Sequence, residues 1–185
     1  MNIRPAQLAD MDLIYGLDHG FQTDHVWQLS SKAANDEYTA VLRLAKLPRV
    51  ISVPFAHDAT ALRRLIHRAD FVWVMEGETT GAAGLGSRDI MAYLSMTLLP
   101  WQNTGWVTSL AVRPADRRKG VATQLLQAAL TQARQEGVHS ITADVATKNY
   151  PATRLFQVRG YKFVGYSENF YSAHDIALMF AARIR

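Results

Sequence analysis

The stretch from Val107 to Ala133 constrains the fold more than any other part of this 185-residue chain, because its pattern changes period within a few residues. An apolar run from Val107 to Val112 is typical of a buried strand, and the turn residues 113–116 follow it. Apolar residues then recur at helical spacing from Val121 to Ala133, and Gly137 is a suitable stop. The pattern predicts a strand, a basic turn and a helix in direct succession.

The turn between this strand and this helix is strongly basic. Four of the seven residues 113–119 are Arg or Lys, against one Asp. The first N–H groups of a helix lack internal acceptors and lie at the positive end of its dipole, and a glycine such as Gly120 lets an anion approach the backbone. A pyrophosphate is the ligand that suits such a turn. The alternative is an exposed basic turn on an ordinary amphipathic helix.

The order of the residues in this turn adds a more specific signal. Arg117-x-x-Gly120-x-Ala122 resembles the Gln/Arg-x-x-Gly-x-Gly/Ala signature with which the GNAT superfamily of N-acetyltransferases binds acetyl-coenzyme A (acetyl-CoA). A second motif, Asn149-x-x-Ala152-x-x-Leu155-Phe156-x-x-x-Gly160-Tyr161, is similar to Asn-x-x-Ala-x-x-Leu-Tyr-x-x-x-Gly-Phe of the same family. The resemblance covers roughly residues 106–178.

The resemblance implies a fold, a co-substrate and a reaction. The fold would be α/β (α+β), a mixed central sheet of about seven strands flanked by helices, in a single domain over residues 1–185. The reaction would be direct transfer of an acetyl group from acetyl-CoA to a primary amine of a small molecule or peptide. In the family, the strand before the basic turn pairs with the pantetheine amides, the Asn contacts coenzyme A and its helix lies beside the pantetheine arm. The cofactor-binding residues would be Leu110, Ala111, Val112, Arg117, Arg118, Lys119, Gly120, Val121, Ala122, Thr123, Asn149, Ala152 and Phe156.

The catalytic acid and base are less clear from the sequence. Phe156 stands where the family usually has the Tyr that protonates the departing thiolate, and residues 108–109 are Thr and Ser where many members have a carboxylate. A general acid typically raises the reaction rate by roughly 10²- to 10⁴-fold. Because the usual Tyr and the usual carboxylate are both absent, the alternative function is a non-catalytic acyl-CoA-binding sensor or regulatory module. The catalytic candidates are Tyr171 and Glu168, and Tyr150, a water molecule and Asp144 stay open as substitutes.

The C-terminal part of the chain carries a looser likeness. Tyr166-Ser-Glu168-Asn-Phe-Tyr171, followed by Asp175-Ile-Ala-Leu-Met179, loosely resembles streptothricin-type acetyltransferases. The match is short and does not specify an antibiotic substrate.

Composition narrows the remaining function classes. The chain has no cysteine, which excludes disulfides, thiolate zinc sites and a cysteine nucleophile. The formal charge of +4 suits an anionic ligand, but the basic residues form one short cluster, so we expect no nucleic-acid partner. No apolar run is long enough for a membrane span and the N-terminus is not a signal peptide, so we expect a cytoplasmic protein without a membrane partner. We expect no metal, because Asp18, His19, Asp24 and His25 do not have the spacing of metal ligands. A homodimer is a possible assembly, since dimers are common among such domains.

Other elements follow from local patterns. Asp10 is a suitable cap for a first helix, and Asp58 or Thr60 for a second helix through Ile66. Asn149 is a suitable cap for a helix that begins with Tyr150 and Pro151. The expected strands are residues 2–5, 38–46, 71–75, 80–85, 91–99, 106–112, 140–146, 162–171 and 176–184.

Overall fold

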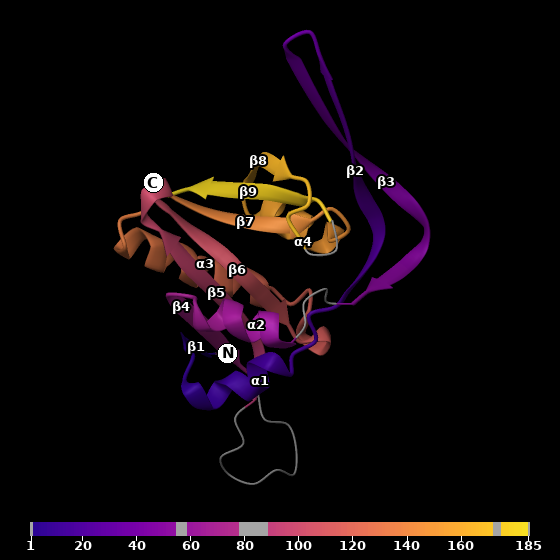
Figure 1. The fold of residues 1–185 in the computed structure, drawn as a ribbon. Coiled ribbons are helices and arrows are strands. Elements are labelled where there is room, and N and C mark those ends of the chain that lie inside the picture. The colour runs from indigo at the N-terminus through magenta and orange to yellow at the C-terminus, as the bar shows by residue number, and fades with distance from the viewer. Residues whose placement is uncertain (1, 55–58, 78–88, 172–174, 185) are drawn as a thin grey trace. The chain divides into compact units, whose positions relative to one another are not determined.

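A computed structural model describes residues 2–54, 59–77, 89–171 and 175–184. Its main sheet has seven strands in the order β1-β4-β5-β6-β7-β9-β8, and a second sheet consists of β2 and β3 (Figure 1). Neighbouring strands from β1 to β6 are antiparallel, whereas β6 and β7 are parallel, so the sheet is mixed. The expected strand 80–85 and the expected cap at Asp58 lie outside the described residues.

The chain divides into two compact units, each made of separate stretches of sequence. The first comprises Met1–His19, Phe55–Asp144 and Ala181–Arg185, and the second comprises Gly20–Pro54 and Val145–Phe180. The single domain expected from the sequence stays a prediction, and the two units are described in turn.

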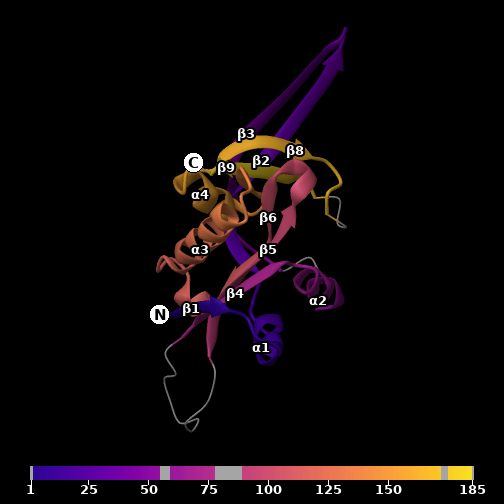
Figure 2. The same cartoon turned by 90° about the vertical axis from the view of Figure 1, so that its left-hand side faces the viewer.

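The first unit builds its core on both faces of the strands β4 (Phe71–Glu76), β5 (Ile90–Leu99) and β6 (Thr104–Val112). Helix α3 (Val121–Gln135) lies on one side of these strands, and α1 (Met11–Tyr15) and α2 (Ala59–His67) lie on the other (Figure 2). The α1/α2 face is closed by a buried cluster of Ile14, Leu62, Ile66, Val74, Ile90, Tyr93 and Ala111. On its own apolar face, α3 buries Val121, Leu125, Leu126, Ala129 and Ala133.

The stretch from β6 to β7 (Ser140–Ala146) follows the predicted order of strand, turn and helix. The helix α3 begins at Val121 and is followed by Gly137, whose φ of +71° is left-handed, as the sequence predicted for a stop. The strand β6 begins at Thr104, two residues earlier than predicted, because a 3₁₀ turn over Pro100–Gln102 and a left-handed Asn103 complete the preceding turn first.

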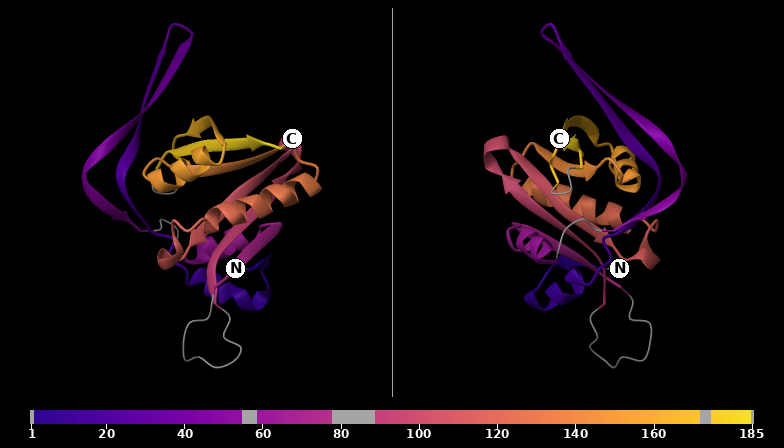
Figure 3. Two further views of the ribbon diagram at one scale, coloured as in Figure 1. Left: turned by 180° about the vertical axis from the view of Figure 1, so that it is seen from behind. Right: turned by 45° about the vertical axis from the view of Figure 1, so that its right-hand side comes forward.

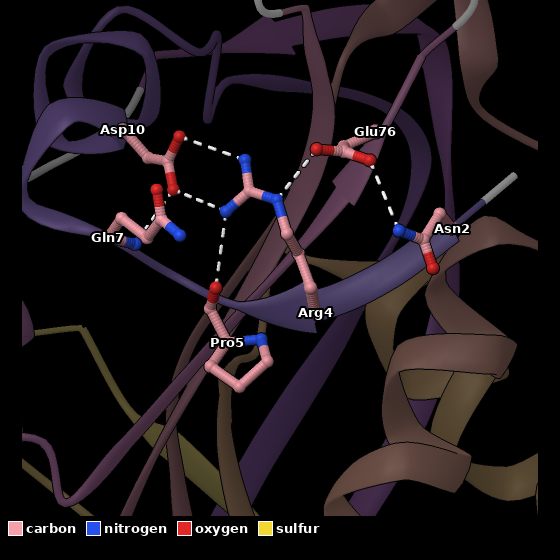
Figure 4. Close-up of polar contacts among 6 residues, drawn as sticks. All are labelled: Asn2, Arg4, Pro5, Gln7, Asp10 and Glu76. Atoms are coloured by element: carbon pink, nitrogen blue, oxygen red, sulfur yellow. Dashed lines mark hydrogen bonds and ion pairs between the residues drawn. The ribbon is translucent and has the colours of Figure 1, made fainter.

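Strand β1 (Asn2–Pro5) is tied to the rest of the first unit by an ion-pair cluster (Figure 4). The Arg4 guanidinium donates to both carboxylate oxygens of Asp10, at 2.6 and 3.0 Å, and to Glu76 at 2.6 Å. Asp10 also accepts from the backbone N–H of Gln7 at 2.7 Å and is fully buried. Asp10 is the N-cap residue of α1, as the sequence predicted, but its side chain makes no capping hydrogen bond there, because its carboxylate binds Arg4 and the Gln7 N–H instead.

The second unit contains the long hairpin of β2 (Phe21–Ala34) and β3 (Glu37–Val53), which both views of Figure 3 show as a twisted two-stranded ribbon. Asn35 and Asp36 form its two-residue turn, and both have the positive φ that such turns require. The sequence predicted a strand only over 38–46. Pro48 is accommodated within β3 because residues 47–50 lie in an irregularity of the ladder, where no paired N–H is needed.

The rest of the second unit consists of α4 (Tyr150–Val158), β8 (Lys162–Ser167), and parts of β7 and β9 (Ala177–Arg183). Trp27 of β2 connects the hairpin to these elements through two hydrogen bonds. The Trp27 backbone N–H donates to the Thr147 carbonyl at 3.0 Å, and its indole N–H donates to the Thr153 hydroxyl at 3.2 Å. Strand β8 is shorter than predicted because a turn at residues 168–169, with Asn169 left-handed, ends it.

Candidate functional site

The strand before the basic turn carries a bulge that frees one of its edges. Ser95 of β5 pairs with Ser109, but Met96 pairs with Val107, so Thr108 is an extra residue in β6. On the other edge, β6 pairs with β7 only from Thr104 to Val107. Within the described part of the chain, the edge of β6 that faces away from β5 is therefore unpaired along residues 108–112. The predicted pantetheine-binding residues Leu110, Ala111 and Val112 lie on this free edge.

Much of the charge in the basic turn is neutralised by neighbouring carboxylates. Arg113 donates to Asp116 at 2.7 Å and to Asp89 at 2.9 Å, and Lys119 donates to Asp116 at 3.1 Å. The hydrogen bond with Asp116 first, and then that with Asp89, raises the pKa of Arg113, and Arg113 and then Lys119 lower the pKa of Asp116. The cluster is therefore less positive than a count over residues 113–119 indicates, because Asp89 enters it from outside that stretch.

The two remaining arginines of the turn have different surroundings. Arg117 is half-buried and shapes the loop, since its guanidinium donates to the Val112 carbonyl at 2.9 Å and to the Asp18 carbonyl at 2.8 Å. Arg118 is exposed, has a left-handed φ of +65°, and makes no side-chain hydrogen bond or ion pair with the residues that the structure describes. Arg118 is thus the cation of this turn that is available to an anionic ligand.

The N-terminus of α3 has the features of an anion site. Gly120 is its N-cap residue, with a φ of +83°, and no side chain of the described residues caps the helix there. A Cβ built on Gly120 would meet nothing within 4 Å, so the backbone is open to close approach. The backbone N–H groups of Val121, Ala122 and Thr123 belong to the first turn of a 15-residue helix, and they fit the pyrophosphate that the sequence predicted.

The predicted residues of α4 have clear structural roles in the second unit. The Asn149 side chain caps α4 by accepting from the backbone N–H of Ala152 at 3.1 Å. Phe156 is buried, with its ring 5.0 Å from that of Tyr161 and 6.2 Å from that of Phe180. The cap was predicted from sequence. Contact of these residues with coenzyme A stays a prediction.

The candidate acids and bases differ in their surroundings. Glu168 is exposed in the turn after β8, and Tyr171 is half-buried, with its ring edge-on to Phe170. Asp144 accepts from the Trp106 indole N–H at 2.7 Å, and the Tyr150 ring lies 4.8 Å from that of His25. Glu168 and Tyr171 belong to the second unit, whereas residues 110–123 belong to the first. Their catalytic roles stay predictions.

A polar chain on the α1/α2 face of the first unit was not predicted. His19 Nε2 lies 2.7 Å from the Tyr93 hydroxyl, which lies 2.5 Å from the Ser109 hydroxyl. Burial is the main cause of a lowered pKa for His19 and a raised pKa for Tyr93. Ser109 is one of the two residues, with Thr108, that the sequence resemblance set against a carboxylate of many family members. The polar Tyr93 within the apolar strand β5 was the sequence signal that could have been followed.

The described residues contain no group of three or more His, Asp or Glu side chains placed to hold a metal ion. They also contain no helix with the length and apolar character that a membrane crossing requires.

Comparisons with known proteins agree with this architecture. A model of the acetyltransferase (GNAT) family matches residues 36–161. Among solved structures, nourseothricin acetyltransferase aligns with a TM-score of 0.81 and 21% identity, over 100% of this chain and 98% of that one. A protein of Bacillus anthracis str. Ames, named as a streptothricin acetyltransferase and solved with acetyl coenzyme A, aligns with a TM-score of 0.72 and 15% identity, over 100% and 97%.

Among curated proteins, an N-alpha-acetyltransferase of Saccharolobus solfataricus is 33% identical over 78 residues. These residues are 42% of this chain, and the chain spans about half, 47%, of that relative's length. The family model covers more than half of the chain, and the seven-stranded mixed sheet with its four helices confirms the predicted fold class. The chain belongs to the GNAT family of acetyltransferases.

Proposed function

We propose that this protein is an acetyl-CoA-dependent N-acetyltransferase that transfers the acetyl group directly to a primary amine of a small molecule or peptide. The observation that carries the proposal is the continuity of two features within the first unit. The free edge of β6 at Leu110–Val112 leads through the turn into the open N-terminus of α3 at Gly120. A ligand that combines amide groups with a pyrophosphate matches both features.

The residues of the first unit would divide the binding between them. The backbone N–H and C=O groups of Leu110 and the N–H of Val112, which point away from β5, would pair with the pantetheine amides, as an additional strand pairs with a sheet edge. The first-turn N–H groups of α3 would hold the pyrophosphate, with Arg118 as an additional cation. Arg117 would act on the loop conformation, since its guanidinium is committed to two backbone carbonyls.

When bound, acetyl-CoA supplies a thioester, and the protein would then act through placement and electrostatics. Fixing the amine and the thioester together removes much of the entropic barrier. A backbone N–H on the bulged part of β6 would donate to the oxyanion of the tetrahedral adduct. The chain has no cysteine, so a direct transfer is consistent with its composition.

The class of the acceptor amine is proposed from the relatives. Two structures of similar fold are named for nourseothricin and for streptothricin, and the curated relative is named an N-alpha-acetyltransferase. The proposed acceptor is therefore a primary amine of a small molecule or of a peptide. The cytoplasmic location and the homodimer expected from the sequence stay predictions.

Titration calorimetry and a thiol-release assay test the proposal together. We expect micromolar binding of acetyl-CoA and weaker binding of dephospho-coenzyme A. Because the chain has no cysteine, a thiol reagent reports only the coenzyme A that is released. The amines are nourseothricin and a short peptide with a free α-amino group, and the control is the same peptide with a blocked N-terminus.

The outcomes separate the two candidate functions. Release that depends on a free amine supports the acetyltransferase. Tight binding without release for any amine supports the sensor module, and the absence of binding by folded protein refutes both.

A further inference from the structure

We propose that His19, Tyr93 and Ser109 form a proton relay that accepts the proton of the attacking amine, with Ser109 as the residue that contacts the amine nitrogen. This inference rests on the proposed function and deepens it, because it assigns the acceptor of the amine proton, for which the sequence offered Glu168 and Asp144 as candidates. Ser109 would be the catalytic residue. Tyr93 and His19 act through it and are positioning residues.

The geometry forms a continuous path from the free part of β6 to the loop after α1. The two hydrogen bonds, 2.5 Å from Ser109 to Tyr93 and 2.7 Å from Tyr93 to His19, are short enough for proton transfer along the chain. The Tyr93 side chain is fully buried, so solvent does not interrupt the path in the middle. Ser109 and His19 are each half-buried, so one end can meet a substrate and the other can release a proton.

The position of Ser109 favours a role in chemistry. It is the first residue after the bulge at Thr108, on the part of β6 that β7 leaves unpaired and next to Leu110. Bulges are frequent next to active sites because they redirect side chains. The neighbouring hydroxyl groups of Ser95 and Thr108 lie 2.8 Å apart and bond to each other. The hydrogen bonds from Ser109 instead continue through Tyr93 to the imidazole of His19.

The surroundings of His19 set the direction of transfer. Burial lowers its pKa, the hydrogen bond with the Leu17 backbone and the nearby Asp18 raise it, and the nearby Arg117 lowers it. The net direction is downward, so the ring is neutral near pH 7. In the relay, Nε2 would carry the lone pair that accepts from the Tyr93 hydroxyl, and Nδ1 would carry the ring hydrogen.

The amine nitrogen bonds to the thioester carbon, the C–S bond then breaks, and its electron pair leaves with the thiolate sulfur. The proton shed by nitrogen passes to Ser109 Oγ, the Ser109 proton passes to Tyr93, and the phenolic proton passes to His19 Nε2. The imidazolium releases that proton to solvent, and the thiolate takes one from solvent. Burial keeps the pKa of Tyr93 well above its usual range, so the phenol passes a proton on without remaining ionised.

The experiment measures two quantities, the tautomer of the His19 imidazole and the rate of turnover. The ¹⁵N shifts of its imidazole identify the tautomer in the uniformly labelled full chain, without any substrate. Turnover of nourseothricin is followed from pH 5.5 to 9 in His19→Gln, Tyr93→Phe and Ser109→Ala. The matched control is His67→Gln, because His67 is an exposed histidine of the same unit whose ring lies 3.4 Å from the Tyr15 hydroxyl, outside the relay.

We expect a neutral His19 ring with Nε2 as acceptor and a changed Nε2 shift in Tyr93→Phe. Turnover should fall about 10²-fold in each relay variant, with the acetyl-CoA dissociation constant and the folding midpoint close to those of the wild type. His19→Gln should also lose the decrease in rate on the acid side that follows His19 protonation, whereas His67→Gln should keep both rate and profile.

Three results would overturn the relay: an Nε2–H tautomer, unchanged turnover in Ser109→Ala, or an unchanged pH profile in His19→Gln. If the wild type binds acetyl-CoA but turns over neither nourseothricin nor the peptide, the proposed function fails. The relay then has no amine proton to carry, and the tautomer reports only whether His19 Nε2 accepts from Tyr93, so the failure of the function and the failure of the geometry are told apart.

Discussion

Replacement of Gly120 by Ala should separate a structural requirement for glycine from a ligand-binding one. Gly120 has a φ of +83°, and a left-handed conformation costs an L-residue about 1–2 kcal/mol. A Cβ at this position would meet nothing within 4 Å, so no steric clash adds to that cost in the free protein. For a domain of this length, each kcal/mol lowers the melting temperature by roughly 2–4 °C.

The same methyl group should act differently once a ligand is present. It would stand in the open space beside the first turn of α3, where the pyrophosphate is proposed to approach. We expect the acetyl-CoA dissociation constant to rise at least about tenfold, which corresponds to roughly 1.4 kcal/mol.

Gly137→Ala is the matched control, because Gly137 follows the other end of the same helix. Its φ is +71°, and a Cβ there would also meet nothing within 4 Å. Denaturant unfolding should show a similar loss of stability in both variants, and calorimetry should show weakened acetyl-CoA binding only in Gly120→Ala. Equal affinity in the two variants would mean that Gly120 serves the loop alone, and the pyrophosphate assignment would then be wrong.

Four other substitutions, at three residues, test individual contacts. Asn149→Ala should cost about 1 kcal/mol by removing the acceptor for the Ala152 N–H, whereas Asn149→Asp should keep the cap and, in calorimetry, lose only affinity for acetyl-CoA. Tyr161→Phe should stabilise the protein by about 1–3 kcal/mol in urea unfolding, because among the described residues its buried hydroxyl has no partner; destabilisation would reveal one. Arg4 holds the pKa of Glu76 below its ordinary value of 4.5, so its stabilisation is present above that pH and lost as the pH falls. Unfolding of Glu76→Gln across a pH series should therefore show a weaker acid dependence.

The sequence was most informative where local signals and the fold agree. The change of period around Gly120 predicted β6, the basic turn and α3 nearly to the residue, because glycine, turn residues and apolar spacing all act locally. Asn149 likewise marked the start of α4. These residues belong to the two motifs that identified the family.

Contacts between residues distant in sequence could not be predicted in the same way. Asp89 neutralises part of the basic turn from a distance of 24 residues, and Tyr93 joins His19 to Ser109 across 74 and 16 residues. No local spacing encodes such pairs. The β2–β3 hairpin was only partly recognised, although Asn35-Asp36 is a turn signal, because its outer strands lack the apolar alternation of a sheet that packs on a core.

The outer part of that hairpin has a consequence for hydrogen exchange. All side chains from Ser30 to Val41 are exposed, and this part of the ladder pairs only with itself among the described strands. A two-stranded ribbon without a covering layer is marginally stable in water. Its amides should therefore exchange through local opening, at rates that reflect the ribbon alone. Substitutions in the buried face of α3 would change the exchange of core amides and leave that of residues 30–41 unaltered.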